Sequence, residues 1–259
     1  MNQPSTTSPV LTREHLLDVL HQHIASLPGI IALWEGGSTA FGRTDQWSDI
    51  DLAIALEDDA VEATIASVDA LLETLGTVEL RWRVPDPTWH GSSQVFYRLT
   101  ETDPHLLLDI GFIHRSAPQR FLERELHGEP VVLFDRENFT APPPFDEEAH
   151  RAGIERRRAE MRKTIPLFSL FVEKELRRGR LIDALAFYHG STLRPLAELL
   201  RMKYEPHHST FGLRYLHDEL PPEVANRLQK LAYVANGDDL LTKQREAQQW
   251  IAELLEENS

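Results

Sequence analysis

Two aspartates separated by one residue open an alternating segment at residues 49–56, which reads Asp-Ile-Asp-Leu-Ala-Ile-Ala-Leu. Successive side chains of a strand point to opposite faces, so Asp49 and Asp51 project from the same face. Carboxylates placed in this way can share a pair of ions about 3.5 to 4 Å apart, and magnesium prefers such hard oxygen ligands. The pair predicts a site for two Mg²⁺ ions, although two solvated acids at a strand end would give the same pattern.

Asp109 is the third acid that could do chemistry, because it interrupts the apolar run from Leu106 to Phe112. An unpaired carboxylate in such a strand is costly to bury. If its strand neighbours that of Asp49, one pair of metal ions satisfies all three acids. The alternative is an ion pair between Asp109 and an arginine, either Arg81 or Arg98.

A glycine-rich turn precedes the paired acids by about ten residues. Gly36 and Gly37 allow a tight turn with close backbone approach, and Ser38 then opens a short helical segment whose N–H groups and hydroxyl can hold a phosphate. Arg43 follows in the same loop and is either a contact for a triphosphate or an ordinary loop arginine. Glu79, on a later alternating segment, is a candidate general base or a plain edge-strand acid.

The elements that must position these residues fall into two halves with different periodicity. Apolar spacing predicts helices at residues 14–27, 59–75 and 117–126, and strands at 29–34, 49–56, 78–84, 94–100, 105–113 and 130–134. Three prolines at 142–144 then mark a boundary between a domain of residues 1–144 and one of residues 145–259. Beyond them a period of 3.6 predicts helices at 146–178, 180–204, 209–220, 221–235 and 239–257. The fold class is therefore α/β (α+β) with a mixed sheet, followed by an all-helical bundle.

Composition and charge restrict the function further. The chain has no cysteine, which excludes disulfides, thiolate catalysis and sulfur-ligated metals. No stretch approaches the ~20 apolar residues of a membrane span, and the N-terminus lacks a targeting pattern, so we expect a cytoplasmic protein. Residues 1–144 hold 22 Asp and Glu against 9 Arg and no Lys, whereas the rest hold 19 acids against 18 bases. An acidic first half repels a long nucleic acid and attracts metal ions and cationic ligands.

The positions of Gly37, Ser38, Asp49, Asp51 and Asp109 resemble the signature of the DNA polymerase beta-like nucleotidyltransferase superfamily. That signature is a glycine-serine turn, an Asp-x-Asp pair on a strand and a later strand acid. The order of the two halves is similar to the aminoglycoside and lincosamide nucleotidyltransferases, which move a nucleoside monophosphate from a triphosphate onto an antibiotic hydroxyl.

This resemblance implies a Mg²⁺-dependent transfer of AMP from ATP to a hydroxyl of a small polyol, with release of pyrophosphate. The acidity of the first half favours a cationic polyol, such as an aminoglycoside-like or lincosamide-like antibiotic. The three acids would bind the metal, Gly37, Ser38 and Arg43 would bind the nucleotide, and residues 145–259 would form one wall of the acceptor pocket. Two alternatives stay open, namely a protein-modifying or antitoxin-like nucleotidyltransferase and an idle nucleotide-binding regulatory module. The spacing of Arg201 and His207 also resembles the Arg-x-His motif of HEPN ribonucleases superficially.

Overall fold

The computed structural model describes residues 11–86 and 88–256 of the chain. The chain divides into two compact units, Met1–Phe145 and Asp146–Ser259, which are described separately. The first is an α/β unit built on one mixed sheet, and the second is entirely helical in its described residues, so the predicted fold class is confirmed. Among the described helices, none has the length and apolarity that crossing a membrane requires.

The first unit contains a six-stranded sheet in the order β3-β4-β5-β2-β1-β6. Its strands are β1 (Ile30–Glu35), β2 (Ile50–Leu56), β3 (Val78–Arg83), β4 (Ser93–Leu99), β5 (Leu108–His114) and β6 (Val131–Asp135). β2 and β5 run parallel, and the other neighbouring strands are antiparallel. All six predicted strands are present, each within a few residues of its expected bounds.

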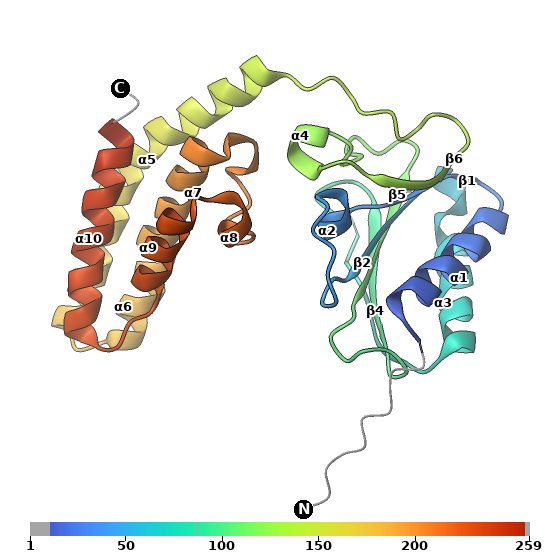
Figure 1. Ribbon diagram of the computed structural model, residues 1–259, viewed down its shortest axis with the longest axis horizontal. Coiled ribbons are helices and arrows are strands. Elements are labelled where there is room, and N and C mark those ends of the chain that lie inside the picture. Colours follow the sequence, from blue (N-terminus) through green and yellow to red (C-terminus); the bar gives the residue numbers. More distant parts are fainter. Residues whose placement is uncertain (1–10, 87, 257–259) are drawn as a thin grey trace, which may run out of the picture. The chain divides into compact units, whose positions relative to one another are not determined.

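One face of this sheet is covered by α1 (Arg13–Ser26) and α3 (Val61–Leu75), the latter preceded by a short 3-10 turn at Asp58–Ala60 (Figure 1). Thr12 begins α1, because its side chain accepts a hydrogen bond from the backbone N–H of His15. The buried residues of α1 recur at helical spacing and pack with Leu52 and Ile54 of β2 in the main core. Because side chains alternate along a strand, this packing turns Asp51 to the opposite face.

That opposite face carries two short helices, α2 (Gly37–Ala40) and α4 (Arg124–His127) (Figure 1). A smaller apolar cluster, which includes Trp34, Ala55 and Leu122, covers part of it. The predicted helix at 117–126 is wrong, since only residues 124–127 are helical. The backbone of Phe121 has φ 58°, a left-handed conformation that no α-helix accommodates.

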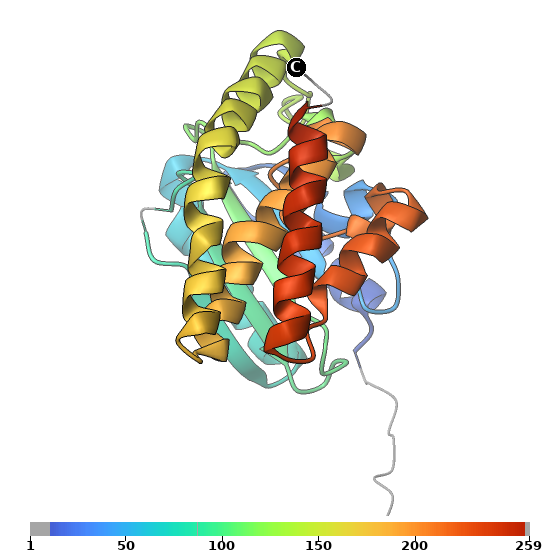
Figure 2. The same ribbon diagram turned by 90° about the vertical axis from the view of Figure 1, so that its left-hand side faces the viewer.

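The second unit is built around its longest helices, α5 (Glu147–Arg177) and α10 (Gly237–Glu256), which run side by side and are yellow and red in Figure 2. The other helices are α6 (Leu181–Tyr188), α7 (Arg194–Tyr204), α8 (Leu216–Glu219) and α9 (Pro222–Ala232). A π-helical segment at His189–Leu193 joins α6 to α7, and a 3-10 turn at Pro206–His208 follows α7. α5 continues through Pro166.

The predicted helix at 209–220 is wrong except for α8, because Gly212 and Tyr215 both have positive φ. This irregular segment is fixed by Arg201, which is fully buried and pairs with the buried Glu219. Arg201 also donates from Nε to the carbonyl of Gly212 at 3.1 Å. His207 pairs instead with Glu147 at 2.7 Å. Arg201 therefore has a structural role inside the bundle, which argues against the ribonuclease interpretation.

Candidate active site

Asp51 and Asp109 are direct neighbours across the parallel strands β2 and β5. Each is the second residue of its strand, and the register pairs them one to one. Directly opposed residues lie on the same face with side chains about 5 Å apart. Two of the predicted metal ligands therefore stand side by side on the face that α1 and α3 leave uncovered.

Asp49 lies immediately before β2 and reaches across to the start of β5. Its Oδ1 accepts a hydrogen bond from the backbone N–H of Leu107 at 3.0 Å, while the N–H of Ile50 donates to the Leu107 carbonyl at 2.9 Å. These contacts fix where the two strands begin relative to each other. The third acid is thus held at the same end of β2 and β5 as the other two.

Asp109 is a carboxyl group in an unfavourable place for a negative charge. Burial, together with the nearby carboxylates of Asp51 and Asp49, raises its pKa from 3.8 to about 6. Gln94 of β4 opposes this shift, because its Nε2 donates to Asp109 Oδ1 at 2.7 Å. Neutralisation by a cation would remove the cost of keeping these three acids ionised together.

The alternative role for Asp109, an ion pair with arginine, is wrong. Arg81 pairs with Asp69 of α3 at 2.7 Å, and Arg98 pairs with Glu79 at 3.0 Å. Asp109 instead has the neutral amide of Gln94 as its hydrogen-bond partner.

Glu79, the candidate general base, is not brought to the three acids. It lies on β3, which is separated from β5 by β4, and both of its carboxylate oxygens accept hydrogen bonds from Arg98. The residue of β3 that aligns with Asp109 through Phe96 is Trp82, and Glu79 lies about 10 Å further along the strand. Among the acids singled out in the sequence, Asp109 is the better placed for proton transfer.

Gly37 packs directly against the carboxylate of Asp51. Its φ is +54°, and a Cβ built on it would lie 1.7 Å from Asp51 Oδ2. The preceding Gly36 donates its N–H to the Asp51 carbonyl at 2.8 Å, which ties the turn to β2. The sequence predicted that the backbone of this turn would approach a phosphate closely. In the structure the backbone of Gly37 approaches the carboxylate of Asp51, and only glycine fits there.

Ser38 and Arg43 lie in the same segment, on and just after α2. The carbonyl of Ser38 accepts the N–H of Arg43 at 2.9 Å, and the Arg43 guanidinium lies 5.2 Å from the ring centroid of Phe41. The three candidate nucleotide-binding residues thus come from one continuous loop beside Asp51. Their contact with a nucleotide stays a prediction.

Arg13 is a site residue that the sequence did not single out. Its Nη2 pairs with the buried Glu35 of β1 and donates to Thr39 Oγ1 of α2 at 3.2 Å. It also donates to the backbone carbonyl of Asp49 at 3.2 Å. One guanidinium therefore holds α1, β1, α2 and the residue before β2 together, and nothing in the local sequence signals contacts over such separations.

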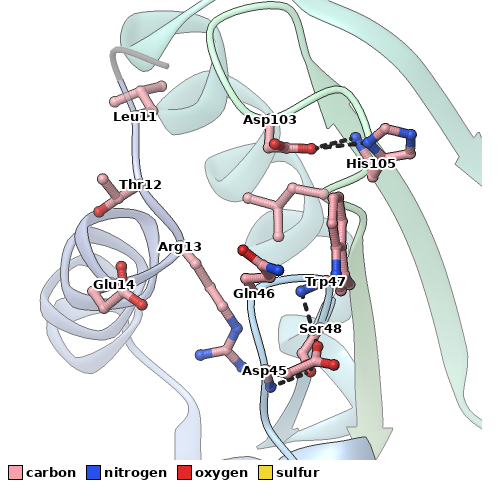
Figure 3. Close-up of a pocket in the computed structure, with 11 residues that line it drawn as sticks. Leu11, Thr12, Arg13, Glu14, Asp45, Gln46, Trp47, Ser48, Asp103 and His105 are labelled. Carbon is pink, nitrogen blue, oxygen red and sulfur yellow. Dashed lines mark hydrogen bonds and ion pairs between the residues drawn. The ribbon is translucent and has the colours of Figure 1, made fainter. Parts of the chain in front are cut away.

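A cavity of about 260 Å³ is lined by Arg13 and by the loop that precedes Asp49 (Figure 3). Its walls come from the start of α1, from residues 45–48 and from residues 103, 105 and 106. Trp47 is 60% exposed and meets His105 edge to face, with centroids 5.7 Å apart. Figure 3 shows Arg13 reaching from α1 toward the 45–48 loop.

The chemistry of the three acids fits a hard divalent cation, since they offer carboxylate oxygens at the same end of β2 and β5. In the described residues, however, no three His, Asp or Glu side chains already converge on one point. One oxygen of Asp49 accepts a hydrogen bond from Leu107, and one oxygen of Asp109 accepts a hydrogen bond from Gln94. Metal binding by this set would require a rotation about χ2, a torsion whose preferences are broad in aspartate.

No protein-family model and no curated protein matches this sequence. Among solved structures, the chain is similar to an aminoglycoside 6-adenyltransferase from Bacillus subtilis, with 14% identity, a TM-score of 0.36, and coverage of 93% of this chain and 88% of that chain. It is also similar to a nucleotidyltransferase-like protein from Exiguobacterium sibiricum, with 16% identity, a TM-score of 0.38, and coverage of 94% and 74%. Both likenesses are too remote to carry a functional argument, so function must be argued from this chain's own side chains.

Proposed function

We propose that this chain is a Mg²⁺-dependent nucleotidyltransferase that transfers AMP from ATP to a hydroxyl of a small, cationic polyol and releases pyrophosphate. The observation that carries the proposal is the direct pairing of Asp51 with Asp109, with Asp49 at the same strand ends and Gly37 against Asp51. A buried carboxyl group with a raised pKa, such as that of Asp109 beside Asp51, is commonly part of a functional site.

In this proposal Asp49, Asp51 and Asp109 hold the metal, and the Gly37 turn with Ser38 and Arg43 holds the triphosphate. When bound, Mg²⁺ would stabilise negative charge on the attacking and leaving oxygens of an in-line displacement. The acceptor oxygen forms a bond to the α-phosphorus while the bond to the bridging oxygen of pyrophosphate breaks. The chain's own contribution is to orient the donor phosphates beside Asp51.

The Asp109 carboxylate is the proposed acceptor of the proton that leaves the attacking hydroxyl. A general base must lie within hydrogen-bond reach of the proton that it accepts, and Asp109 stands directly beside Asp51 across the two strands. Gln94 orients the side chain through its 2.7 Å hydrogen bond. Glu79 is excluded from this role by its distance and by its bidentate pairing with Arg98.

The decisive experiment incubates the full-length protein with ATP labelled at the α-phosphate, Mg²⁺ and a panel of aminoglycosides, lincosamides and hydroxyl-bearing proteins. We expect label on a cationic small molecule, and a decrease of at least about 100-fold for Asp51→Asn, since this change removes the charge that holds a hard cation. Asp18→Asn, on the exposed side of α1, is the matched control and should transfer at the wild-type rate. Transfer by Asp51→Asn at a near-normal rate in saturating Mg²⁺ would refute the mechanism.

A further inference from the structure

Two aromatic side chains continue the row of catalytic candidates across the sheet. The register aligns Trp82 of β3 with Phe96 of β4, Phe96 with Asp109 of β5, and Asp109 with Asp51 of β2. Residues that oppose each other directly in neighbouring strands share a face of the sheet. Trp82 and Phe96 therefore lie on the same open face as the acids, beginning one strand away from Asp109.

The two rings stack on each other, and no described element of the first unit buries the outer face of Trp82. They stack with their centroids 5.5 Å apart and their planes 16° apart, and Trp82 remains 53% exposed. The opposite face of β3 is fixed to α3, because Arg81 pairs with Asp69 and Arg83 with Glu62. These pairs lie on the face of α3, so the alternation of β3 and its pairing with β4 place Trp82 on the other face.

The direction of the proposed reaction places the acceptor over these rings. The donor phosphates are assigned to the Gly37 turn, which flanks Asp51 from the side of β1. In an in-line displacement the attacking and leaving oxygens lie on opposite sides of the phosphorus. With pyrophosphate leaving toward Gly37, the acceptor hydroxyl must approach from the side of Asp109 and β4, where Phe96 and Trp82 lie.

We propose that Trp82, supported by the stacked ring of Phe96, forms part of the acceptor site and packs against a ring of the acceptor that carries amino groups, such as an aminosugar or aminocyclitol. This inference rests on the proposed function and names the side chains that select its acceptor. The face of an indole attracts a cation more strongly than the other aromatic side chains do, and the neighbouring acids add negative charge. Trp82 is two strands, or about 10 Å, from Asp109, so an acceptor that reaches both must span that distance.

The test measures binding by calorimetry with the full-length protein, in the absence of ATP and Mg²⁺, using neomycin as a cationic multi-ring probe and raffinose as a neutral one. Trp82→Ala should weaken neomycin binding by about 3- to 30-fold, the effect of losing one cation–π contact. Trp82→Phe should restore most of the affinity, since it keeps an aromatic face. Trp89→Ala is the matched control, because Trp89 is 85% exposed but lies in the loop before β4, and it should bind like wild type.

Kinetics separate this inference from the proposed function. If both hold, Trp82→Ala raises the KM for the acceptor and leaves the KM for ATP unchanged, and Phe96→Ala does the same. If Trp82→Ala loses neomycin binding but the wild-type protein transfers no nucleotide to any acceptor, the binding site for a cationic ring is supported and nucleotidyl transfer is refuted. Conversely, Asp51-dependent transfer with equal neomycin binding by wild type and Trp82→Ala, or with no neomycin binding by wild type, would overturn the role of Trp82 alone.

Discussion

At the scale of single residues, Asp109 stands where its negative charge destabilises the fold. Burial, together with Asp51 and Asp49, raises its pKa to about 6, above the 3.8 of an ordinary aspartate. Well below pH 3.8 the carboxyl is neutral in both the folded and the unfolded chain, so it imposes no penalty. As the pH rises from about 4 to about 6, the unfolded chain releases this proton first, and the folded state loses stability until both forms are ionised.

We therefore predict that Asp109→Asn stabilises the metal-free protein at pH 8 and does so far less at pH 4. Asparagine keeps the shape of the side chain and can still accept the hydrogen bond from Gln94. The expected gain in the free energy of unfolding at pH 8 is about 1 to 3 kcal/mol, after allowing for partial solvent screening. Urea unfolding in the presence of a chelator measures it, and a gain of equal size at both pH values would contradict the assigned cause.

Gly37 offers a second test at this scale, because Gly42 provides a control with the same backbone constraint. Both glycines have positive φ, +54° and +65°, but a Cβ on Gly42 meets nothing within 4 Å, whereas one on Gly37 strikes the Asp51 carboxylate. Gly42→Ala should cost only the left-handed strain, about 1 to 2 kcal/mol. Gly37→Ala should cost more and should also abolish most transfer. Equal stability and equal activity of the two variants would show that the Gly37 contact is unimportant.

At the scale of elements, Arg13 couples four segments through one guanidinium. Its partner Glu35 is only 3% exposed, so Arg13→Ala leaves a buried carboxylate without its cation. We expect a loss of about 3 to 5 kcal/mol in the free energy of unfolding. Adding Glu35→Gln to Arg13→Ala should recover part of this loss, because the uncompensated charge is removed. A double variant as unstable as the sum of the two single variants would rule out direct coupling.

The elements also show how far the sequence alone could predict this fold. The alternating apolar pattern predicted β2, because it places Ile50, Leu52 and Ile54 on one face of a strand. The same pattern places Asp51 on the opposite face. The helices expected at 117–126 and 209–220 failed for a different reason. Apolar spacing reports which side chains can be buried, but it does not report backbone conformation, and Phe121 and Tyr215 both adopt positive φ.

The sequence predicted those site residues that the pattern of a single strand reveals, but not the contacts between strands. The acids Asp49, Asp51 and Asp109 follow from strand patterns, and their role as metal ligands stays a prediction. The alignment of Trp82 with Asp109 depends on the register of three strands, and Gln94 meets Asp109 by the same register. A single sequence does not reveal which strands are neighbours, so these contacts could not be foreseen.

At the scale of the whole molecule, the chain has separate hydrophobic cores in its two units. The core around Ile54 draws its buried residues from positions 11–112, and the core around Leu200 draws them from positions 161–254. Both side chains are fully buried, so truncating either to alanine should cost about 2 to 5 kcal/mol. We predict that Ile54→Ala and Leu200→Ala lower different transitions in calorimetry. A single transition lowered by both substitutions would contradict this prediction.

The charge of the molecule is concentrated in the first of these units, with 22 Asp and Glu against 9 Arg in residues 1–144, while the remaining residues are nearly neutral. This excess attracts a cationic acceptor over distances longer than a hydrogen bond and repels ATP. Salt shortens the range of both effects, from about 10 Å at 0.1 M ionic strength to about 3 Å at 1 M. We therefore predict that raising the ionic strength increases the KM for a cationic acceptor far more than it lowers kcat.

The KM for ATP provides the internal control for this prediction. Salt screens the repulsion between ATP and the acidic first unit, so the KM for ATP should stay unchanged or fall. A neutral acceptor such as a simple sugar alcohol should respond weakly in either direction, since it carries no charge for the field to act on. Opposite responses of the two substrates in one assay cannot arise from general salt inactivation, which would impair both. If the KM for ATP rose with that of the cationic acceptor, the acidic field of the first unit would have no part in selecting the acceptor, and recognition would rest on short-range contacts such as those proposed for Trp82.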